Sequence, residues 1–355
     1  MSGTPSVFFG GNMDMYGCYG KVRLHIKQRM MLVLCGVWLV ACRTGRRLPE
    51  EQVSAELKLV VWNVQTFFDA VTDGTEFSSF SKSRGLWNRE RYAERVERLC
   101  AVLKQLDADV AVLLEVEHKG IIYDISNGLA SESWKRAKRY RYAFFARAPD
   151  ASFGCAVLSR YNLADACVHM VQTDTAGAGR LRPILQTDVV VQDRRLTLFV
   201  NHWKSKSGGE AATAPLRRLQ EQLLAACIQP VLRTDTGYSA VVACGDFNRD
   251  EAEFEHRITG TGHSVVMKAA DGSEVLMHSP WTAYDKTLPV QGSYYYRNRW
   301  ERIDCIFSCG ACSIKGFRAE YEGPWAQKNG TPYAYRLSNG QGYSDHLPVS
   351  CRIQI

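Results

Sequence analysis

The spacing of apolar residues predicts both strands and helices from residue 57 onward. A helix is expected at Arg89–Leu106, where apolar side chains recur at helical spacing, and a second at 215–232, with Pro215 in its first turn. Alternating or uninterrupted apolar runs predict strands at 57–61, 110–114, 153–159, 184–191, 196–201, 240–244, 304–308 and 347–353. The apolar signal thins between 249 and 302, where long surface loops are expected. Since no Gly/Pro-rich break divides this stretch, we interpret 57–355 as one α/β domain.

The residues before 57 follow a different pattern. A basic stretch precedes an apolar run at 30–41, which is long enough for the core of a signal peptide and too short to span a bilayer comfortably. The run ends in LVAC, which resembles the lipobox of bacterial lipoproteins. We therefore expect a leader at 1–41, lipidation of Cys42, a polar tether at 42–56, and attachment to a membrane of the bacterial cell envelope. A plain signal peptide or an uncleaved anchor is the alternative, and translation could begin at a later methionine.

Composition and charge leave the choice of partner open. Hydrophobic residues make up 46% of the chain and charged residues 23%, which is ordinary for a globular protein and excludes intrinsic disorder. The net charge is +7; the leader holds four basic residues and one aspartate, so the remainder carries 7 − 3 = +4. A mildly basic body is compatible with a polyanionic substrate, but many proteins with other partners have the same balance.

The twelve cysteines do not form an obvious disulfide framework. Three belong to the leader region, and most others stand within apolar stretches, where a cysteine behaves as a small buried hydrophobe. Cys305, Cys309 and Cys312 are the best disulfide candidates in an exported protein. A zinc site is not expected there, because no fourth ligand follows at ligand spacing.

Nearly every predicted strand ends in a polar residue. In sandwich-like α/β folds, the ends of the strands converge on one rim, so these side chains are expected to meet. Scattered carboxylates, amides and histidines without a catalytic serine or cysteine motif indicate metal-assisted hydrolysis. The residues at these positions are Asn63, Glu115, Asn201, His202, Asp246, Asn248, Asp304, Asp345 and His346.

Six segments carry a family resemblance. They are VWNVQTFFD, LLEVEH, VNHWKSKSGG, CGDFNRD, RIDCIF and YSDHLPV. In this order they resemble the motifs of the endonuclease/exonuclease/phosphatase superfamily, which has the DNase I-like fold. The resemblance extends from about residue 57 to 355 and implies a four-layered α/β sandwich, in which two packed, mostly antiparallel sheets are flanked by helices.

The resemblance also implies a role for each matching residue. Glu115 corresponds to the glutamate that ligates the metal, Asn63 to its companion, and Asp345 to an aspartate close to the metal. The implied ion is Mg²⁺, with Mn²⁺ or Ca²⁺ as alternatives, and a hard ion of this kind prefers oxygen ligands. Glu117 and His118 are interpreted as loop residues and not as ligands.

The remaining motifs imply catalytic roles. Asp246 corresponds to the aspartate that orients or deprotonates the attacking water, and Asn248 to the amide that steadies the water or the phosphoryl oxygens. His346 and Asp304 correspond to a buried pair in which the carboxylate favours imidazolium, which can bond a phosphate oxygen. His202 corresponds to a second histidine near the scissile phosphate.

The segment around His202 bears on the substrate, because its NHxKSK pattern resembles that of secreted bacterial nucleases of this superfamily. Lys204, Lys206 and Arg182 are predicted to bind phosphates, and Trp203 to stack on a base. Further cations and rings are expected in rim loops at Arg180, Arg297, Arg299 and Tyr294–Tyr296. Some abasic-site repair members have an aspartate where this chain has Gln65, which argues mildly against a repair nuclease.

Three functions remain open. A nuclease at the cell surface, acting as a monomer on DNA or RNA, is the leading hypothesis. A lipid or small-molecule phosphoesterase, either sphingomyelinase-like or an inositol-phosphate phosphatase, is the alternative. It would be favoured by an apolar rim hairpin, which the sequence around Phe67, Phe68, Phe77 and Phe80 does not predict. A catalytically silent surface-binding lipoprotein is the third, and the presence of every expected catalytic residue speaks against it.

Overall fold

The computed structural model describes residues 6–9, 55–80, 86–130, 135–149, 151–171, 181–234, 239–259, 262–281 and 288–355. The predictions for Cys42, Arg180 and most of the leader and tether lie outside these ranges. Of the predicted leader, Ser6–Phe9 is described as strand β1, which pairs with β4 (Tyr142–Arg147). Among the described segments, no helix is long and apolar enough to cross a membrane.

The first sheet has seven strands in the order β1-β4-β5-β3-β2-β17-β16. Strands β2 and β3 are parallel, and the other neighbours pair antiparallel. The remaining strands of this sheet are β5 (Gly154–Ser159), β3 (Val110–Val116), β2 (Glu56–Phe67), β17 (Val349–Gln354) and β16 (Ser313–Ala319).

The second sheet has eight strands in the order β10-β11-β12-β15-β9-β8-β7-β6, and β8 and β9 are its parallel pair. A separate hairpin is formed by β13 (Tyr294–Tyr296) and β14 (Arg299–Glu301). The strands of the large sheet are β10 (Glu255–Thr259), β11 (Gly262–Lys268), β12 (Glu274–His278), β15 (Asp304–Gly310), β9 (Ala240–Asp246), β8 (Arg194–His202), β7 (Ile184–Val191) and β6 (Asn162–His169).

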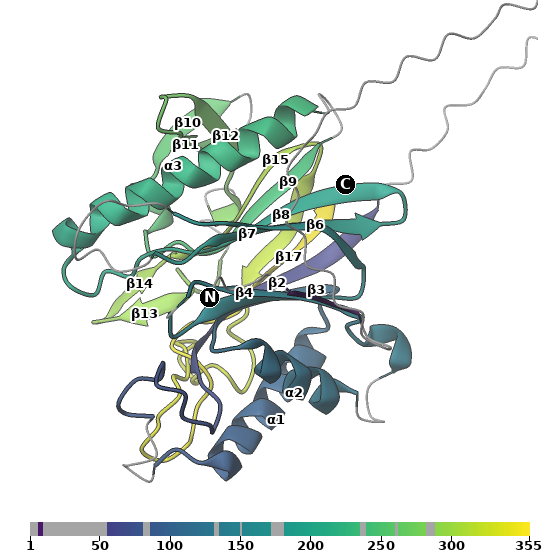
Figure 1. Cartoon of the computed structure of the whole chain (residues 1–355). Helices are drawn as coiled ribbons and strands as arrows, with labels where there is room; N and C mark the ends of the chain where they lie inside the picture. The colour runs from purple at the N-terminus through teal and green to yellow at the C-terminus, as the bar shows by residue number, and fades with distance from the viewer. Residues whose placement is uncertain are drawn as a thin grey trace, which may run out of the picture.

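Three helices complete a four-layered sandwich, which confirms the predicted fold. Figure 1 shows α1 (Arg89–Leu106) and α2 (Lys119–Leu129) outside the first sheet and α3 (Glu210–Thr234) outside the second. Residues from both sheets and all three helices belong to one buried apolar cluster. Two 3-10 turns, Arg136–Lys138 and Glu251–Glu253, lie in the connections.

Local sequence accounts for the bounds of α1. The side chain of Asn88 accepts a hydrogen bond from the backbone N–H of Arg91, which caps the first turn. Asp107 ends the helix in the left-handed conformation, with φ 48°, and its N–H bonds the carbonyl of Leu103. The apolar face between these caps, which includes Leu99, is buried against the first sheet. The predicted range is therefore confirmed.

Three expectations about the architecture were wrong. The stretch 249–302 was expected to be loops, but β10, β11 and β12 extend the second sheet there, and the short run Val265–Met267 is buried. Helix α3 begins at Glu210, so Pro215 lies beyond its first turn. Cys305, Cys309 and Cys312 are free thiols: Cys305 is buried in β15, and the Cys312 thiol contacts the carbonyl of Cys309, 3.4 Å away, so no disulfide links them.

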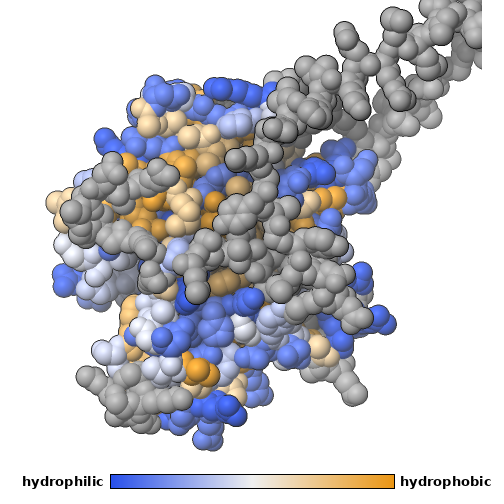
Figure 2. All heavy atoms as spheres, viewed as in Figure 1, coloured by the Kyte–Doolittle hydropathy of each residue, from blue (hydrophilic) through white to orange (hydrophobic). Residues whose placement is uncertain are grey.

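The visible surface is mixed in character. In Figure 2, hydrophilic residues are interspersed with smaller hydrophobic patches over the described part of the face. Phe67, Phe68 and Phe80 are buried, whereas Phe77 is 48% exposed while its ring packs on Phe68 and Phe153. Phe68, Phe80 and Phe153 belong to a small core of their own beside the main one, whereas Phe67 is part of the main core.

Candidate active site

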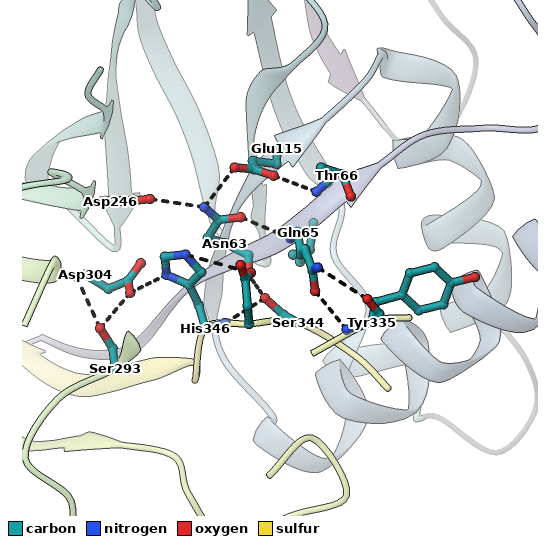
Figure 3. Close-up of polar contacts among 12 residues, drawn as sticks. Asn63, Gln65, Thr66, Glu115, Asp246, Ser293, Asp304, Tyr335, Ser344 and His346 are labelled. Carbon is teal, nitrogen blue, oxygen red and sulfur yellow. Dashed lines mark hydrogen bonds and ion pairs between the residues drawn. The ribbon is translucent and has the colours of Figure 1, made fainter. Parts of the chain in front are cut away.

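Strand ends from both sheets bring the predicted polar residues together. Asn63 on β2 and Glu115 on β3 come from neighbouring parallel strands of the first sheet. Asp246 and Asp304 are direct partners in the β9–β15 pairing of the second sheet. Figure 3 shows these side chains and His346 converging on one place between the sheets.

The amide of Asn63 joins the two sheets. Its Nδ2 donates to Oε1 of Glu115 at 3.2 Å and to Oδ2 of Asp246 at 3.1 Å, while its Oδ1 accepts from the backbone N–H of Gln65. The other oxygen of Glu115 accepts from the backbone N–H of Thr66 at 2.6 Å. Because all of these bonds are made at once, the amide and both carboxylates are held in fixed positions (Figure 3).

The backbone of the site is strained at several functional positions. Glu115, Thr66 and Asn248 have backbone φ angles of 64°, 44° and 48°. Residues other than glycine rarely adopt such positive values. Each such residue costs on the order of 1–3 kcal/mol, and such strain gathers at active sites. At Gly245, which has φ 137°, an added Cβ would lie 1.8 Å from the carbonyl oxygen of Asn201, so the close approach of β8 and β9 requires glycine.

Asp304 and His346 form the buried pair that was predicted. The Oδ2 of Asp304 lies 2.8 Å from Nδ1 of His346 and also accepts from the hydroxyl of Ser293 at 2.6 Å. Burial disfavours imidazolium, but the charge and hydrogen bond of Asp304 outweigh it and raise the pKa of His346 well above its ordinary value. The surroundings of His346 therefore favour its imidazolium form.

Asp246 combines burial with a crowded electrostatic environment. Its Oδ1 accepts from the backbone N–H of Asn248 at 2.8 Å. Burial, followed by repulsion from Asp304, raises the pKa of Asp246 to about 7. A carboxylate with a pKa near neutrality is suited to accept a proton from water. The Nδ2 of Asn248 donates to the carbonyl of Trp203, which fixes the GDFN turn.

His202 has the opposite electrostatic character to His346. Its Nε2 lies 3.7 Å from Oε1 of Glu115 and 3.7 Å from Oδ2 of Asp246. Burial, with the charge of Arg182 second, lowers the pKa of His202 well below its ordinary value. The surroundings of the two histidines therefore favour opposite charge states, the neutral form for His202 and the cationic form for His346.

The oxygen atoms at this centre fit a hard divalent cation. The pKa of the half-buried Asp345 is raised, mainly by burial. The negative charge of the nearby Glu115 adds to this increase. Carboxylates that repel one another in this way are stabilised by a cation between them. Ligand atoms of Asp246, Asp304 and His346 also lie within 4.8 Å of one another. Asp304 and His346 are already bonded to each other, so we do not assign a metal ion to these three residues.

The predicted substrate-binding residues differ in availability. Lys206 is held by glutamates, with its Nζ 3.0 Å from Glu301 and 3.5 Å from Glu253, so it does not project freely toward a phosphate. Lys204 donates to the carbonyl of Ser207 at 3.4 Å. Arg182 uses one Nη atom to bond the carbonyl of Trp203 at 2.8 Å.

The expectation that Trp203 stacks on a base was wrong. Its side chain is fully buried, its Nε1 donates to Oδ1 of Asn201, and its ring packs on Phe247 and Phe254. In place of Trp203, Tyr294 lies at the centre, with its ring centroid 4.7 Å from that of His346.

Two supporting residues were not predicted. Gln65 bonds both backbone groups of Tyr335, as Figure 3 shows, and so connects β2 to the segment before His346. Arg95 is fully buried, donates to the carbonyls of Val64, Gln65 and Thr66, and stacks on two aromatic rings. Burial lowers the pKa of Arg95 to about 9. The positive charge at a buried helix position was the signal that could have identified Arg95.

Glu117 and His118 lie in the connection between β3 and α2, as predicted, and each also has a structural role there. Glu117 follows β3 directly and is fully buried, and His118 caps α2 by accepting from the backbone N–H of Gly120. Burial, followed by repulsion from neighbouring acids such as Asp69, raises the pKa of Glu117 to about 7. Sequence spacing could not reveal this, because the partners of Glu117 come from the loop after β2.

Comparison with known proteins identifies the family. The chain matches the model of the Endonuclease/Exonuclease/phosphatase family over residues 58–354 and therefore belongs to that family. No curated protein matches it.

Solved structures share the fold at low sequence identity. TDP2 from Caenorhabditis elegans is 14% identical with a TM-score of 0.55, over 85% of this chain and 75% of that one. ANGEL2, described as a 2′,3′-cyclic phosphatase, is 14% identical with a TM-score of 0.56, over 85% of this chain and 95% of that one. An endonuclease/exonuclease/phosphatase family protein from Bacteroides thetaiotaomicron is 14% identical with a TM-score of 0.51, over 85% of this chain and 98% of that one. This chain therefore has the phosphoesterase fold of its family.

Proposed function

We propose that this protein is a divalent-metal-dependent phosphodiesterase that hydrolyses nucleic acid at the bacterial cell surface. The observation that carries the proposal is the placement of two groups around the Glu115–Asn63 pair. One is His346, whose imidazolium form is favoured by Asp304, and the other is Asp246, whose pKa is about 7. A cationic donor, a general base and an anionic metal ligand are the groups that hydrolysis of a phosphodiester requires.

The residues have distinct roles in this proposal. Glu115 and Asp345, with Asn63 beside them, would hold Mg²⁺, Mn²⁺ or Ca²⁺, which when bound would neutralise charge on the phosphate. Asp246 accepts the proton of the attacking water, and its pKa of about 7 keeps a large fraction ionised at neutral pH.

The histidines complete the mechanism. Asp304 holds His346 by Nδ1, and Nε2, which lies 3.9 Å from Oδ1 of Asp345, donates to a phosphoryl oxygen as negative charge develops there. His202 remains neutral, and we assign it a contact with the phosphate from the opposite side. Asn248 keeps the turn after Asp246 in place through its bond to Trp203.

Nucleic acid is the substrate class that we favour. Arg182 retains donors beyond its single bond to Trp203, and the rings of Tyr294 and Tyr296 stack on each other next to His346. Cations and aromatic rings beside the hydrolytic groups suit a chain of phosphates and bases. ANGEL2, which shares the fold, is described as acting on a 2′,3′-cyclic phosphate, which supports a nucleotide-type phosphoester here.

The location and state of the protein are also proposals. The lipobox-like LVAC supports lipidation of Cys42 and display on the bacterial cell envelope, and we propose a monomer. Replacing Cys42 with serine should abolish acyl labelling and partition into the detergent phase. Unchanged acylation of Cys42→Ser would contradict the anchor without touching the enzymatic proposal.

One experiment decides the substrate class. The full chain, purified in detergent, is incubated with plasmid DNA, RNA, sphingomyelin and inositol phosphates, each with Mg²⁺, Mn²⁺ or Ca²⁺ and with excess chelator. We expect metal-dependent cleavage of nucleic acid, absent in Asp246→Asn. Cleavage of sphingomyelin or inositol phosphates alone would support the lipid or small-molecule alternative. Binding without turnover of any substrate would support the silent surface-binding lipoprotein.

A further inference from the structure

A second acidic cluster lies beside the active site, on the loop that follows β2. Ligand atoms of Asp69, Glu117 and His118 lie within 4.8 Å of one another, and so do those of Asp73, Glu76 and Glu117. Glu117 is common to both groups, so the carboxylate at the end of β3 links one end of the loop to the other.

One oxygen of the buried member of this cluster lacks a partner among the described residues. Glu117 is fully buried, and its Oε2 accepts from the backbone N–H of Asp69 at 2.7 Å. Its Oε1 has no hydrogen-bond partner among the described residues. An unpaired buried carboxylate oxygen is expensive, and it requires either a proton or a bound cation to compensate. Because Oε1 belongs to the residue shared by both acidic groups, it points to a ligand at this place.

The other carboxylates lack compensating lysines and arginines. Within the described ranges, the ion pairs of Asp69 and Glu117 are with His118, and Asp73 and Glu76 make none. Arg147 acts on Asp73 only through longer-range attraction. The three loop acids are held mainly by neutral hydrogen bonds from the backbone of their own loop, and a divalent cation among them would offset their negative charge.

The hydrogen bonds of His118 decide which kind of cation fits. Its Nδ1 accepts from the backbone N–H of Gly120 at 2.9 Å, so the ring proton is on Nε2, which donates to Oδ2 of Asp69 at 2.9 Å. His118 therefore orients a carboxylate and is not itself a ligand. The set that remains consists of oxygen atoms only, which suits a hard ion and not zinc.

We propose that Asp69, Asp73, Glu76 and Glu117 bind a Ca²⁺ ion that is separate from the catalytic metal. Ca²⁺ accepts about 6–8 oxygen ligands in flexible geometry, so acids from a loop and a strand end can share it with backbone carbonyls and water. The ion fastens the 69–76 loop to the end of β3.

This position gives the ion a structural effect on the active site. The N–H of Glu117 donates to the carbonyl of Phe67 at 3.1 Å, and two residues earlier Glu115 accepts from Thr66. The strands that carry Asn63 and Glu115 therefore meet immediately before the proposed ion. Binding of Ca²⁺ holds these two strand ends together, whatever the substrate is.

Tb³⁺ luminescence provides the test, because Trp87 lies next to the cluster. Its buried indole donates to the backbone carbonyl of Asp69 and is placed to transfer energy to a bound lanthanide. The protein used in the test is the full chain with the substitutions Glu115→Gln and Asp345→Asn, which remove the proposed ligands of the catalytic metal. Tb³⁺ is titrated in, Ca²⁺ is used to displace it, and Ca²⁺ binding is measured in parallel by calorimetry.

The loop variant is Asp73→Asn with Glu76→Gln, in which neither change touches the core. Its matched control is Glu94→Gln with Glu97→Gln, which removes the same charge from the exposed side of α1. We expect one Ca²⁺-displaceable site and a melting temperature that rises with Ca²⁺. The loop variant should weaken binding by about 10-fold or more, and the control should not. Absence of a displaceable site, or equal affinity in the loop variant and the control, would overturn the proposal.

Discussion

Asp304 and His346 are joined by a 2.8 Å contact between Oδ2 and Nδ1, although 42 residues separate them in the sequence. The carboxylate is held from its other side by Ser293, and the imidazole by the bond of its own backbone N–H to Ser344. Because both partners are fixed, the pair acts as one unit, and its Nε2, which lies 3.9 Å from Oδ1 of Asp345, is the ring nitrogen that remains for the reaction.

The first prediction follows from that unity. Asp304→Asn, His346→Asn and the double variant should each lower kcat by about 10²–10⁴, the usual range for general acid–base or electrostatic help. Since the residues act together, the double variant should be little worse than the worse single one. Steady-state kinetics on the three variants, beside thermal melts, measure this.

A purely structural role for the pair would give a different result. If Asp304 only satisfied a buried histidine, the variants would lose stability but keep their turnover per folded molecule. Additive losses in the double variant would equally contradict the assignment.

The second prediction concerns the metal. Glu115→Gln keeps the size of the side chain but removes the anionic ligand, so activity should fall and the Mg²⁺ concentration required should rise. Activity titrated against Mg²⁺ measures the change. If Mg²⁺ affinity is unchanged while activity is lost, Glu115 has another role.

The third prediction is a pH dependence of stability. The pKa of His346 is raised above 6.5 in the folded state, so the folded protein binds more protons than the unfolded chain as pH rises past that value. The stabilisation is complete below pH 6.5 and is lost as pH rises through the folded pKa. Denaturant unfolding between pH about 7 and 9 should show a decline of up to about 1.4 kcal/mol per pH unit. His346→Asn should lack this decline; equal slopes would refute the shift.

Much of the fold could be predicted because the apolar pattern is strong where strands are buried on both faces. Val110–Val116 and Ala240–Asp246 are examples, and α1 begins and ends at its capping residues. The predicted site residues were recognised by family motifs, and the structure brings Asn63, Glu115 and Asp246 into contact.

What could not be predicted depends on tertiary partners. Trp203 looked available because its neighbours are polar, yet its ring is buried in the core against Phe247 and Phe254. Lys206 looked like a phosphate ligand, but glutamates from three other segments surround it. Neither the burial of an aromatic ring nor an ion pair between distant residues is encoded in local spacing.

The fourth prediction separates two predicted phosphate ligands. Arg182→Met should lower kcat/KM by about 10-fold or more, since a hydrogen bond to a charged group contributes about 1.5–3 kcal/mol. Lys206→Met should change it less than about 3-fold, because Lys206 is engaged by Glu301 and neighbouring glutamates. Kinetics on nucleic acid at low and high salt compare the two. A larger loss in Lys206→Met would mean that substrate displaces the glutamates.

The last prediction concerns Gln65, which positions the site without touching the reacting groups. Its Oε1 accepts from the N–H of Tyr335 at 2.8 Å, and its Nε2 donates to the carbonyl of Tyr335 at 3.3 Å. Gln65→Ala leaves both backbone groups unpaired, which should cost about 1–3 kcal/mol of stability and lower kcat more than it changes KM. Gln65→Glu keeps the acceptor for the N–H and loses only the donor, so its loss should be intermediate. Thermal melts and kinetics on both variants test this, and a Gln65→Ala protein with wild-type stability but poor turnover would mean that Gln65 acts directly on the substrate.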